Sequence, residues 1–381
     1  MREHIHPSPP ASRASQTIAR RDFLRAGAAA CFTLPAIGKC LCGEVGESAA
    51  SGAIPSYLKG YESLYARDPR TAAAKWFVDA KYGLFLHYTL ASLIPGGKPE
   101  LKKRKSTDWQ EMFLQFTAEK FDADAIADLA VAAEMKYVNL TTCHLGGMYL
   151  YRTAASDFTS VNSPAKRDLV GEMADACRKR GLGFFTYVPP GMARTEDDVF
   201  DANRTQLREL LTQYGPLAGM WFDGIGYYYK EPDRYARLGE VFALVRSLQP
   251  QCLISFKNGA LGEEDFLAPE HTFKRVRGKQ SPDAWEKLKD KPVEICATMQ
   301  EKNLWINVEG ARHKTAEDVI KSLRAARANG YNLLLNCGLR GDGSVHPDDD
   351  AALRAAGEIL RTDGFPPVNA ENGGIAPPGN T

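Results

Sequence analysis

The chain of 381 residues lacks the motifs of several common enzyme classes. No G-x-G-x-x-G opens any predicted helix, which argues against a dinucleotide-binding sheet. No G-x-S-x-G marks a nucleophilic serine. H-E-x-x-H and H-x-x-x-H are both missing, and the cysteines after residue 52 are odd in number and widely spaced. The sequence therefore predicts no metal site, no cofactor and no disulfide framework.

Charge of one sign and long apolar runs are also lacking. The formal net charge is +1, so the chain has no electrostatic footprint for nucleic acid, and we expect no such partner. Its one basic run, residues 102–105, is interpreted as a solvated surface patch. The mildly apolar stretch near the N-terminus is too short to span a bilayer, so no membrane span is predicted.

The first 52 residues do not look like part of a fold. Arg20 and Arg21 precede Phe23-Leu24 and an alanine-rich run, which is the pattern of a twin-arginine export signal. We therefore expect residues 1–52 to be a signal peptide with a linker, and the protein to be periplasmic or secreted. Residues 365–381 are rich in Pro, Gly and Asn, and are predicted to be a disordered tail. Residues 53–364 remain as one folded domain.

Short apolar runs alternate with amphipathic stretches from about residue 76 onward. Continuous apolar character is typical of strands covered on both faces, as in a parallel sheet. The eight predicted strands are 82–88, 137–143, 183–188, 219–224, 252–256, 293–299, 304–308 and 332–338. Helices are predicted within 122–136, 163–181 and 315–330, from their apolar periodicity and their capping residues. This alternation predicts an α/β fold, a (β/α)8 TIM-like barrel with a less regular second half; an open doubly wound sheet is the alternative.

Polar side chains collect at the predicted strand ends, where the chemistry of such barrels is found. They are His87, His144, Tyr187, Asp223, Lys257 and Glu294. Each one alone has an ordinary structural explanation, but together they indicate a polar pocket. Carboxylates beside histidines and aromatic rings fit glycoside hydrolysis, which needs one carboxylate as nucleophile or base and another carboxyl group as proton donor.

Seven phrases, in order, resemble glycoside hydrolase family 29, the α-L-fucosidases, from about Trp76 to about Gly343. The phrase "LLTQYGPLAGMWFDG" (210–224) is the most specific of them. The others are 76–88, 108–113, 165–173, 267–270, 293–299 and 329–345. The resemblance implies a retaining glycosidase whose partner is a fucosylated glycan or a similar glycoside; it does not predict the oligomeric state.

The resemblance also implies roles for individual residues. Asp223 is the expected nucleophile and Glu270 the expected acid/base, with Glu294 as a rival for the second role. Their carboxyl groups should lie about 5 to 5.5 Å apart, and Glu270 should be kept protonated by burial or by nearby negative charge. The expected substrate-binding residues are His87, Asp108, Trp109, His144, Tyr187, Trp221, Lys257 and Glu294.

Departures from the family pattern leave other functions open. Leu145 stands where the family usually has a second histidine, and Lys257 where it has an arginine. Tyr187 is followed by Val-Pro-Pro, so one tyrosine of a usual pair is missing. A polar pocket discriminates strongly on lost hydrogen bonds. The alternatives are therefore a glycan-binding barrel with little or no catalysis, and a related hydrolase of another sugar.

Overall fold

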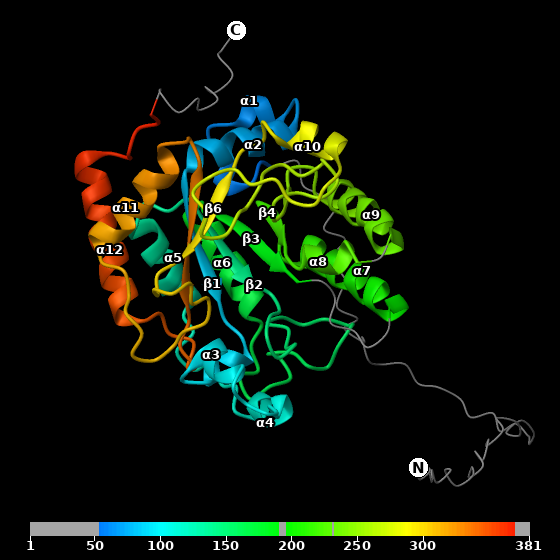
Figure 1. The fold of residues 1–381 in the computed structure, drawn as a ribbon, viewed down its shortest axis with the longest axis vertical. Helices are drawn as coiled ribbons and strands as arrows, with labels where there is room; N and C mark the ends of the chain where they lie inside the picture. The colour runs from blue at the N-terminus through cyan, green and yellow to red at the C-terminus, as the bar shows by residue number, and fades with distance from the viewer. Residues whose placement is uncertain (1–52, 190–195, 231, 370–381) are drawn as a thin grey trace, which may run out of the picture. The chain divides into compact units, whose positions relative to one another are not determined.

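The computed structural model describes residues 53–189, 196–230 and 232–369 of the chain (Figure 1). The predicted signal peptide lies outside these residues, as does the predicted tail from residue 370 onward. Within the described ranges, no helix is long and apolar enough to cross a membrane.

Seven parallel strands form one sheet in the order β5-β4-β3-β2-β1-β7-β6 (Figure 1). They are β1 (Tyr82–His87), β2 (Tyr137–Thr141), β3 (Gly183–Val188), β4 (Gly219–Phe222), β5 (Leu253–Phe256), β6 (Glu294–Thr298) and β7 (Asn332–Gly338). Every pair is parallel, and β1 pairs with both β2 and β7. β1 is an interior strand, and β5 and β6, which follow each other in the sequence, are the two edges of the sheet.

Helices separate most of the strands. They are α1 (Glu62–Tyr65), α2 (Pro69–Ala80), α3 (Gly97–Leu101), α4 (Trp109–Leu114), α5 (Ala123–Ala132), α6 (Leu169–Arg180), α7 (Glu196–Gln213), α8 (Ile225–Tyr228), α9 (Pro232–Leu248), α10 (Pro282–Leu288), α11 (Ala316–Arg327) and α12 (Pro347–Asp363). Short 3-10 turns η1 (Ser56–Leu58) and η2 (Leu90–Leu93) complete the set. Figure 1 shows α3 and α4 at the end of the sheet opposite α1 and α2.

The predicted helix signals are confirmed at their termini. Thr315 and Asp318 form a reciprocal capping box at the start of α11. Asp122 accepts from the Ala125 N–H at the start of α5. Gly181 ends α6 in the left-handed conformation, with φ of 66°.

The predicted strand at 304–308 is wrong, since these residues form a loop after β6. Short apolar runs are ambiguous, and here Lys302 and Asn303 both have φ of 59°, which breaks any extended path just before the run. The place beside β5 and β6 is taken instead by residues 266–270. Bridges join this segment to Ser255 of β5 and to Val293 and Cys296, before and within β6. The barrel is thus closed by seven strands and one bridging segment.

Side chains along each strand point alternately outward and inward, so the core has two parts. Outward side chains pack under the helices, and inward side chains fill the barrel together with Trp76 and Phe77 of α2. Aromatic rings dominate the interior, and glycines make room for them. A Cβ on Gly219, for example, would lie 2.2 Å from the ring of Phe185. Because α2 packs against one end of the barrel interior, a site is expected at the other end, where the strands have their carboxyl ends.

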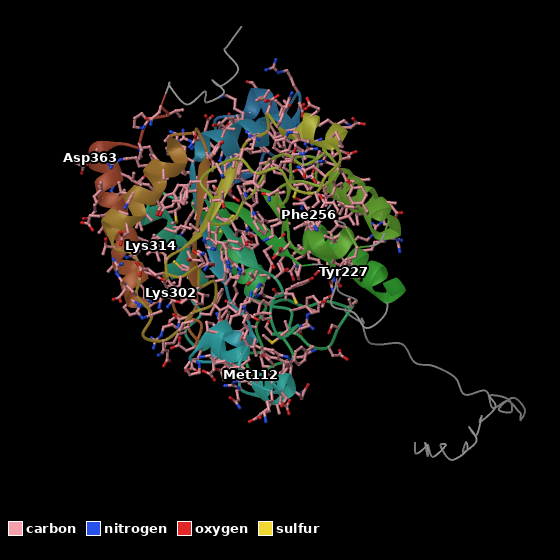
Figure 2. The ribbon with its side chains drawn as sticks, in the orientation of Figure 1. Met112, Tyr227, Phe256, Lys302, Lys314 and Asp363 are labelled. Atoms are coloured by element: carbon pink, nitrogen blue, oxygen red, sulfur yellow. The ribbon has the colours of Figure 1, made fainter. Side chains whose placement is uncertain are left out.

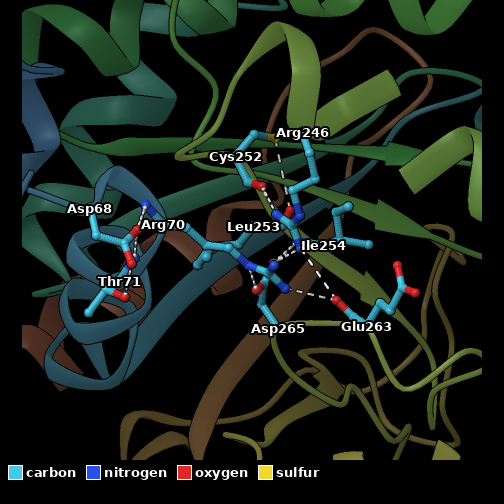
Figure 3. Close-up of polar contacts among 9 residues, drawn as sticks. All are labelled: Asp68, Arg70, Thr71, Arg246, Cys252, Leu253, Ile254, Glu263 and Asp265. Atoms are coloured by element: carbon cyan, nitrogen blue, oxygen red, sulfur yellow. Dashed lines mark hydrogen bonds and ion pairs between the residues drawn. The ribbon is translucent and has the colours of Figure 1, made fainter. Parts of the chain in front are cut away.

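A buried carboxylate fixes the start of the bridging segment (Figure 3). Asp265 accepts from Arg70 Nε of α2 at 2.6 Å and pairs with Arg246 of α9 at 2.5 Å. It also accepts from the Ile254 N–H of β5 at 2.7 Å. Arg70 reaches the Glu263 carbonyl as well, and Arg246 the Cys252 carbonyl. Two helices and one strand are therefore tied to the residue just before Phe266.

Candidate active site

Strand alternation brings the predicted polar residues together. Inward positions follow at steps of two along each strand. His87 lies two residues after Phe85, Tyr187 two after Phe185, and Asp223 two after Trp221. In each pair both side chains therefore lie on the inward face. In the bridging segment, Phe266, Ala268 and Glu270 follow one another at the same spacing of two residues. All of these ends meet at the open end of the barrel.

Asp223 lies one residue beyond β4 and is held from three directions. Tyr187 OH donates to its Oδ2 at 2.6 Å, and Lys257 Nζ lies 2.9 Å from its Oδ1. The Gly224 N–H donates to Oδ1 as well. Burial acts to raise the pKa of Asp223, but the Lys257 ammonium and these hydrogen bonds outweigh it, so the pKa is lowered. Asp223 is therefore an ionised carboxylate in a largely buried position.

One ammonium group joins the two predicted catalytic carboxylates. Lys257 Nζ contacts Glu270 Oε1 as well as Asp223. Burial acts to lower the pKa of Lys257, but the two carboxylates outweigh it and the pKa is raised. Because both acids bond to one nitrogen, their nearest oxygens are separated by no more than two hydrogen-bond lengths, about 6 Å. The burial expected for Glu270 is not found, because 38% of its side chain is exposed.

His87 and His144 line the same site as neutral imidazoles. Their ring centroids are 4.9 Å apart, and both lie against Tyr187. Burial lowers the pKa of His144 to about 4 and also holds that of His87 well below its usual range. His87 Nδ1 donates to Asn336 Oδ1 at 2.6 Å, since the Asn336 amide nitrogen donates to the Trp305 carbonyl. His144 Nδ1 is buried and has no hydrogen-bond partner among the described residues.

Trp221 forms the floor of the site, and Glu294 lies beneath it. The Trp221 ring stacks on Tyr187 at 5.7 Å, and Lys257 Nζ lies 4.8 Å from its centroid. Its Nε1 donates to Glu294 at 3.1 Å, and Tyr137 OH donates to the same carboxyl group at 2.6 Å.

The prediction for Glu294 as a strand-end site residue is therefore wrong. It is the first residue of β6 rather than its exit, and only 1% of it is exposed. Both of its oxygens are engaged in the barrel interior. Burial raises its pKa to about 7. Glu294 supports the floor from below and does not present a group to the pocket.

The structure places Asp108 and Trp109 at the start of α4. Asp108 is exposed, and its carboxylate accepts from the N–H groups of Gln110 and Glu111 as the helix N-cap. No described contact joins Asp108 to the site. Trp109 is partly buried and packs close to Gly146, two residues beyond His144. Trp109 thus borders the site, and a sugar contact by either residue stays a prediction.

Three residues of the site region were not predicted from the sequence. Asn336 orients His87, while Trp305 packs against His87 at 5.1 Å and against His271 at 4.9 Å. Inward alternation along β7 would have found Asn336. Trp305 was hidden because its segment was assigned to a strand, and nothing in the sequence marks His271 beyond its place after Glu270.

The tyrosines that follow Asp223 pack away from the carboxylate. Tyr228 lies edge-on against Phe256 at 5.4 Å, and Tyr229 OH donates to the Gly259 carbonyl at 3.1 Å. Figure 2 labels Tyr227 and Phe256 on this side of the molecule. These contacts join α8 to the loop after β5, which carries Lys257.

The described residues contain no group of three or more His, Cys, Asp and Glu side chains arranged to hold a metal ion. The side chains near the open end are two carboxylates, one ammonium, one phenol and, with His271, three imidazoles.

Comparison with known proteins identifies the family of the chain. The family model for alpha-L-fucosidase matches residues 49–365. Plasma alpha-L-fucosidase of Rattus norvegicus is 28% identical over 81% of this chain and 72% of its own length. Tissue alpha-L-fucosidase of Bos taurus is 26% identical over 81% and 71%, respectively.

Solved structures have the same fold. Alpha-L-fucosidase isoenzyme 1 of Paenibacillus thiaminolyticus superposes with a TM-score of 0.64 at 26% identity, covering 78% of this chain and 77% of the other. An alpha-L-fucosidase of Lactobacillus casei, solved in complex with alpha-L-fucose product, gives 0.61 at 23% identity, covering 76% and 98%. The chain is a glycosidase and belongs to the alpha-L-fucosidase family, glycoside hydrolase family 29.

Proposed function

We propose that this protein is a retaining α-L-fucosidase in which Asp223 is the nucleophile and Glu270 the acid/base. The observation that carries the proposal is the single ammonium of Lys257 in contact with both carboxylates at the open end of the barrel. The upper limit of about 6 Å lies below the roughly 6.5 to 9.5 Å between the carboxyl groups of inverting glycosidases, which supports a double displacement over a single one.

In the first step, an Asp223 oxygen attacks the anomeric carbon while the bond to the leaving oxygen breaks. Glu270 gives its proton to that oxygen. In the second step, Glu270 takes a proton from a water molecule, and the water oxygen displaces Asp223 from the anomeric carbon. Tyr187 and Lys257 orient the attacking carboxylate and keep it charged. Glu270 turns from Lys257 toward the leaving oxygen, which its exposed position allows.

The two histidines support recognition of a neutral sugar in this pocket. His87 donates from Nδ1 to Asn336, so its Nε2 can accept a hydrogen bond from a sugar hydroxyl. His144 Nδ1 has no partner among the described residues, and its pKa of about 4 keeps the ring neutral at ordinary pH. The described relatives act on fucosides, and a fucose ring supplies hydroxyl groups for both imidazoles.

The test is hydrolysis of aryl glycosides by the mature protein. The panel contains the α-L-fucoside beside the β-D-galactoside, α-L-rhamnoside and α-L-arabinoside. We expect turnover of the fucoside, reduced by several orders of magnitude in Asp223→Asn. The matched control Asp290→Asn removes an exposed carboxylate far from the site and keeps full activity. No turnover of any glycoside, with measurable glycan binding, would instead establish the glycan-binding barrel.

We further propose that the protein is exported by the twin-arginine route. The support is Arg20-Arg21 followed by Phe23-Leu24 and an alanine-rich run.

A further inference from the structure

A cleft of about 550 Å³ opens beside the site and is unusually basic. Its lining contains four lysines and no acidic residue. The lining residues are Lys98, Pro99, Lys102, Lys103, His271, Lys302, Asn303, Leu304, Trp305 and Ile306. They come from α3 and the turn after it, from the loop after β6, and from the residue that follows Glu270. Figure 2 labels Lys302, and α3 is labelled in Figure 1.

The protein offsets the charge of these four lysines only weakly, since Lys103 interacts electrostatically with Glu100 without forming an ion pair. Among the described residues, no carboxylate lies within ion-pair distance of Lys98, Lys102, Lys103 or Lys302. The neighbouring Arg104 is different, because it pairs with Glu100 at 2.6 Å. Four like charges around one cleft repel one another, and a cleft lined by charge of one sign concentrates ligands of the opposite sign.

The cleft borders the proposed catalytic centre at Trp305. This ring lies 5.1 Å from His87 in the sugar pocket and 4.9 Å from His271 in the cleft. His271 directly follows Glu270, and its Nε2 is buried without a partner among the described residues. An acid/base stands where the cleaved sugar meets its leaving group. A cleft that begins at the residue after Glu270 therefore lies on the leaving-group side.

We propose that this cleft is the leaving-group subsite and that it binds an anionic saccharide, one that carries a sulfate ester or a carboxylate. Trp305 offers a ring for the apolar face of a sugar, and the lysines offer ammonium groups for the anion. The proposal rests on the proposed function, because it places the anionic sugar next to the fucose that is removed. The proposal also assigns a function to Lys102 and Lys103, the part of the basic run at 102–105 that lines the cleft.

The experiment compares kcat/KM for three α-L-fucosyl disaccharides whose leaving sugars are neutral, O-sulfated and uronic. We expect one or both anionic substrates to exceed the neutral one by about tenfold at low salt, with the preference lost in 0.5 M NaCl. The sulfated and uronic substrates distinguish the two sources of negative charge. The variant Lys102→Gln/Lys103→Gln should lose most of the preference. The control Lys59→Gln/Lys321→Gln removes two exposed charges outside the cleft and should keep it.

Equal kcat/KM for neutral and anionic substrates overturns the proposal, as does an equal loss of preference in the control variant. Competition by a single-stranded oligonucleotide as strong as that by the sulfated sugar also overturns it, because the cleft is then a general polyanion surface. The aryl α-L-fucoside, which has no leaving sugar, is run alongside. If that substrate is not hydrolysed, the proposed function fails and this inference fails with it.

Discussion

Asp223 is charged in a place where burial alone would favour the neutral acid. The Lys257 ammonium makes the difference, together with hydrogen bonds from Tyr187 and from the Gly224 N–H. An ionised and largely buried carboxylate meets the requirements of the proposed nucleophile. Lys257 is thus central to the pH range in which the enzyme can work.

Replacing Lys257 should shift the pH profile. In Lys257→Gln the influence of burial on Asp223 is no longer opposed by the ammonium, so the pKa of Asp223 rises. Because attack needs the ionised form, the acidic limb of kcat/KM against pH should move up by on the order of one pH unit. Lys257→Arg keeps the charge and should leave the limb in place. An acidic limb that stays in place in Lys257→Gln contradicts this account of Asp223.

Glu294 makes a separate prediction about stability. Its pKa is raised from 4.5 to about 7 in the folded protein. The folded state therefore keeps a proton that the unfolded state loses, and the free energy of unfolding falls as pH rises from about 4.5 to 7. Glu294→Gln should lack this fall, and its stability relative to the wild type should rise by on the order of 3 kcal/mol between pH 4.5 and pH 8. Urea unfolding at the two pH values measures the change, and identical pH dependence in both proteins would contradict it.

At the residue scale, the sequence allowed us to predict the site residues that lie on inward strand positions. His87, Tyr187 and Asp223 follow apolar strands closely, so their place at the open end could be predicted. Glu294 was wrongly grouped with them, because it is the second residue of the predicted strand 293–299 and therefore belongs to the start of that strand and not to its exit.

The bridging segment 266–270 is the element on which the site depends most. It replaces the eighth strand and delivers Glu270, yet it makes only single-residue bridges to its neighbours. Asp265 compensates by tying the segment to α2, α9 and β5 (Figure 3). The sequence did not reveal this element, since "FLAPE" is short and contains a proline.

Asp265→Ala should therefore lower both stability and activity. It removes the acceptor of the buried Ile254 N–H and the partner of two partly exposed arginines, Arg70 and Arg246, which should cost about 2 to 3 kcal/mol. Denaturant unfolding measures that loss, and kcat should fall because Glu270 is no longer held in place. Glu286→Ala breaks an exposed ion pair with Lys289 and should cost less than about 1 kcal/mol. An Asp265→Ala protein as stable as this control would contradict the role of the segment.

At the scale of the whole molecule, the barrel could be predicted because alternating apolar strands and capped helices leave few arrangements. The closure of the barrel could not be predicted, because residues 266–270 bridge to β6, which lies further along the chain. The basic cleft could not be found either, since residues 98–103 and 302–306 come together only in the fold.

The proposed export depends on the twin arginines Arg20 and Arg21. Arg20→Lys/Arg21→Lys should keep the protein in the cytoplasm of a bacterial host that has twin-arginine export, while the wild type reaches the periplasm or medium. Cell fractionation followed by immunoblotting measures the distribution. Arg13→Lys, upstream of the twin-arginine pair, is the control and should not change it. Export of the doubly substituted chain at the wild-type level would contradict the predicted route.

The most direct test of the central claim is the anomeric configuration of the fucosyl azide formed when azide rescues two variants on an aryl α-L-fucoside. In Asp223→Gly, azide should replace the nucleophile in a single displacement and give the β-azide. In Glu270→Ala, azide should attack a glycosyl-enzyme on Asp223 and give the α-azide after two inversions. Proton NMR distinguishes the two products. An α-azide from Asp223→Gly would show that another residue attacks the sugar and would contradict the assignment of Asp223.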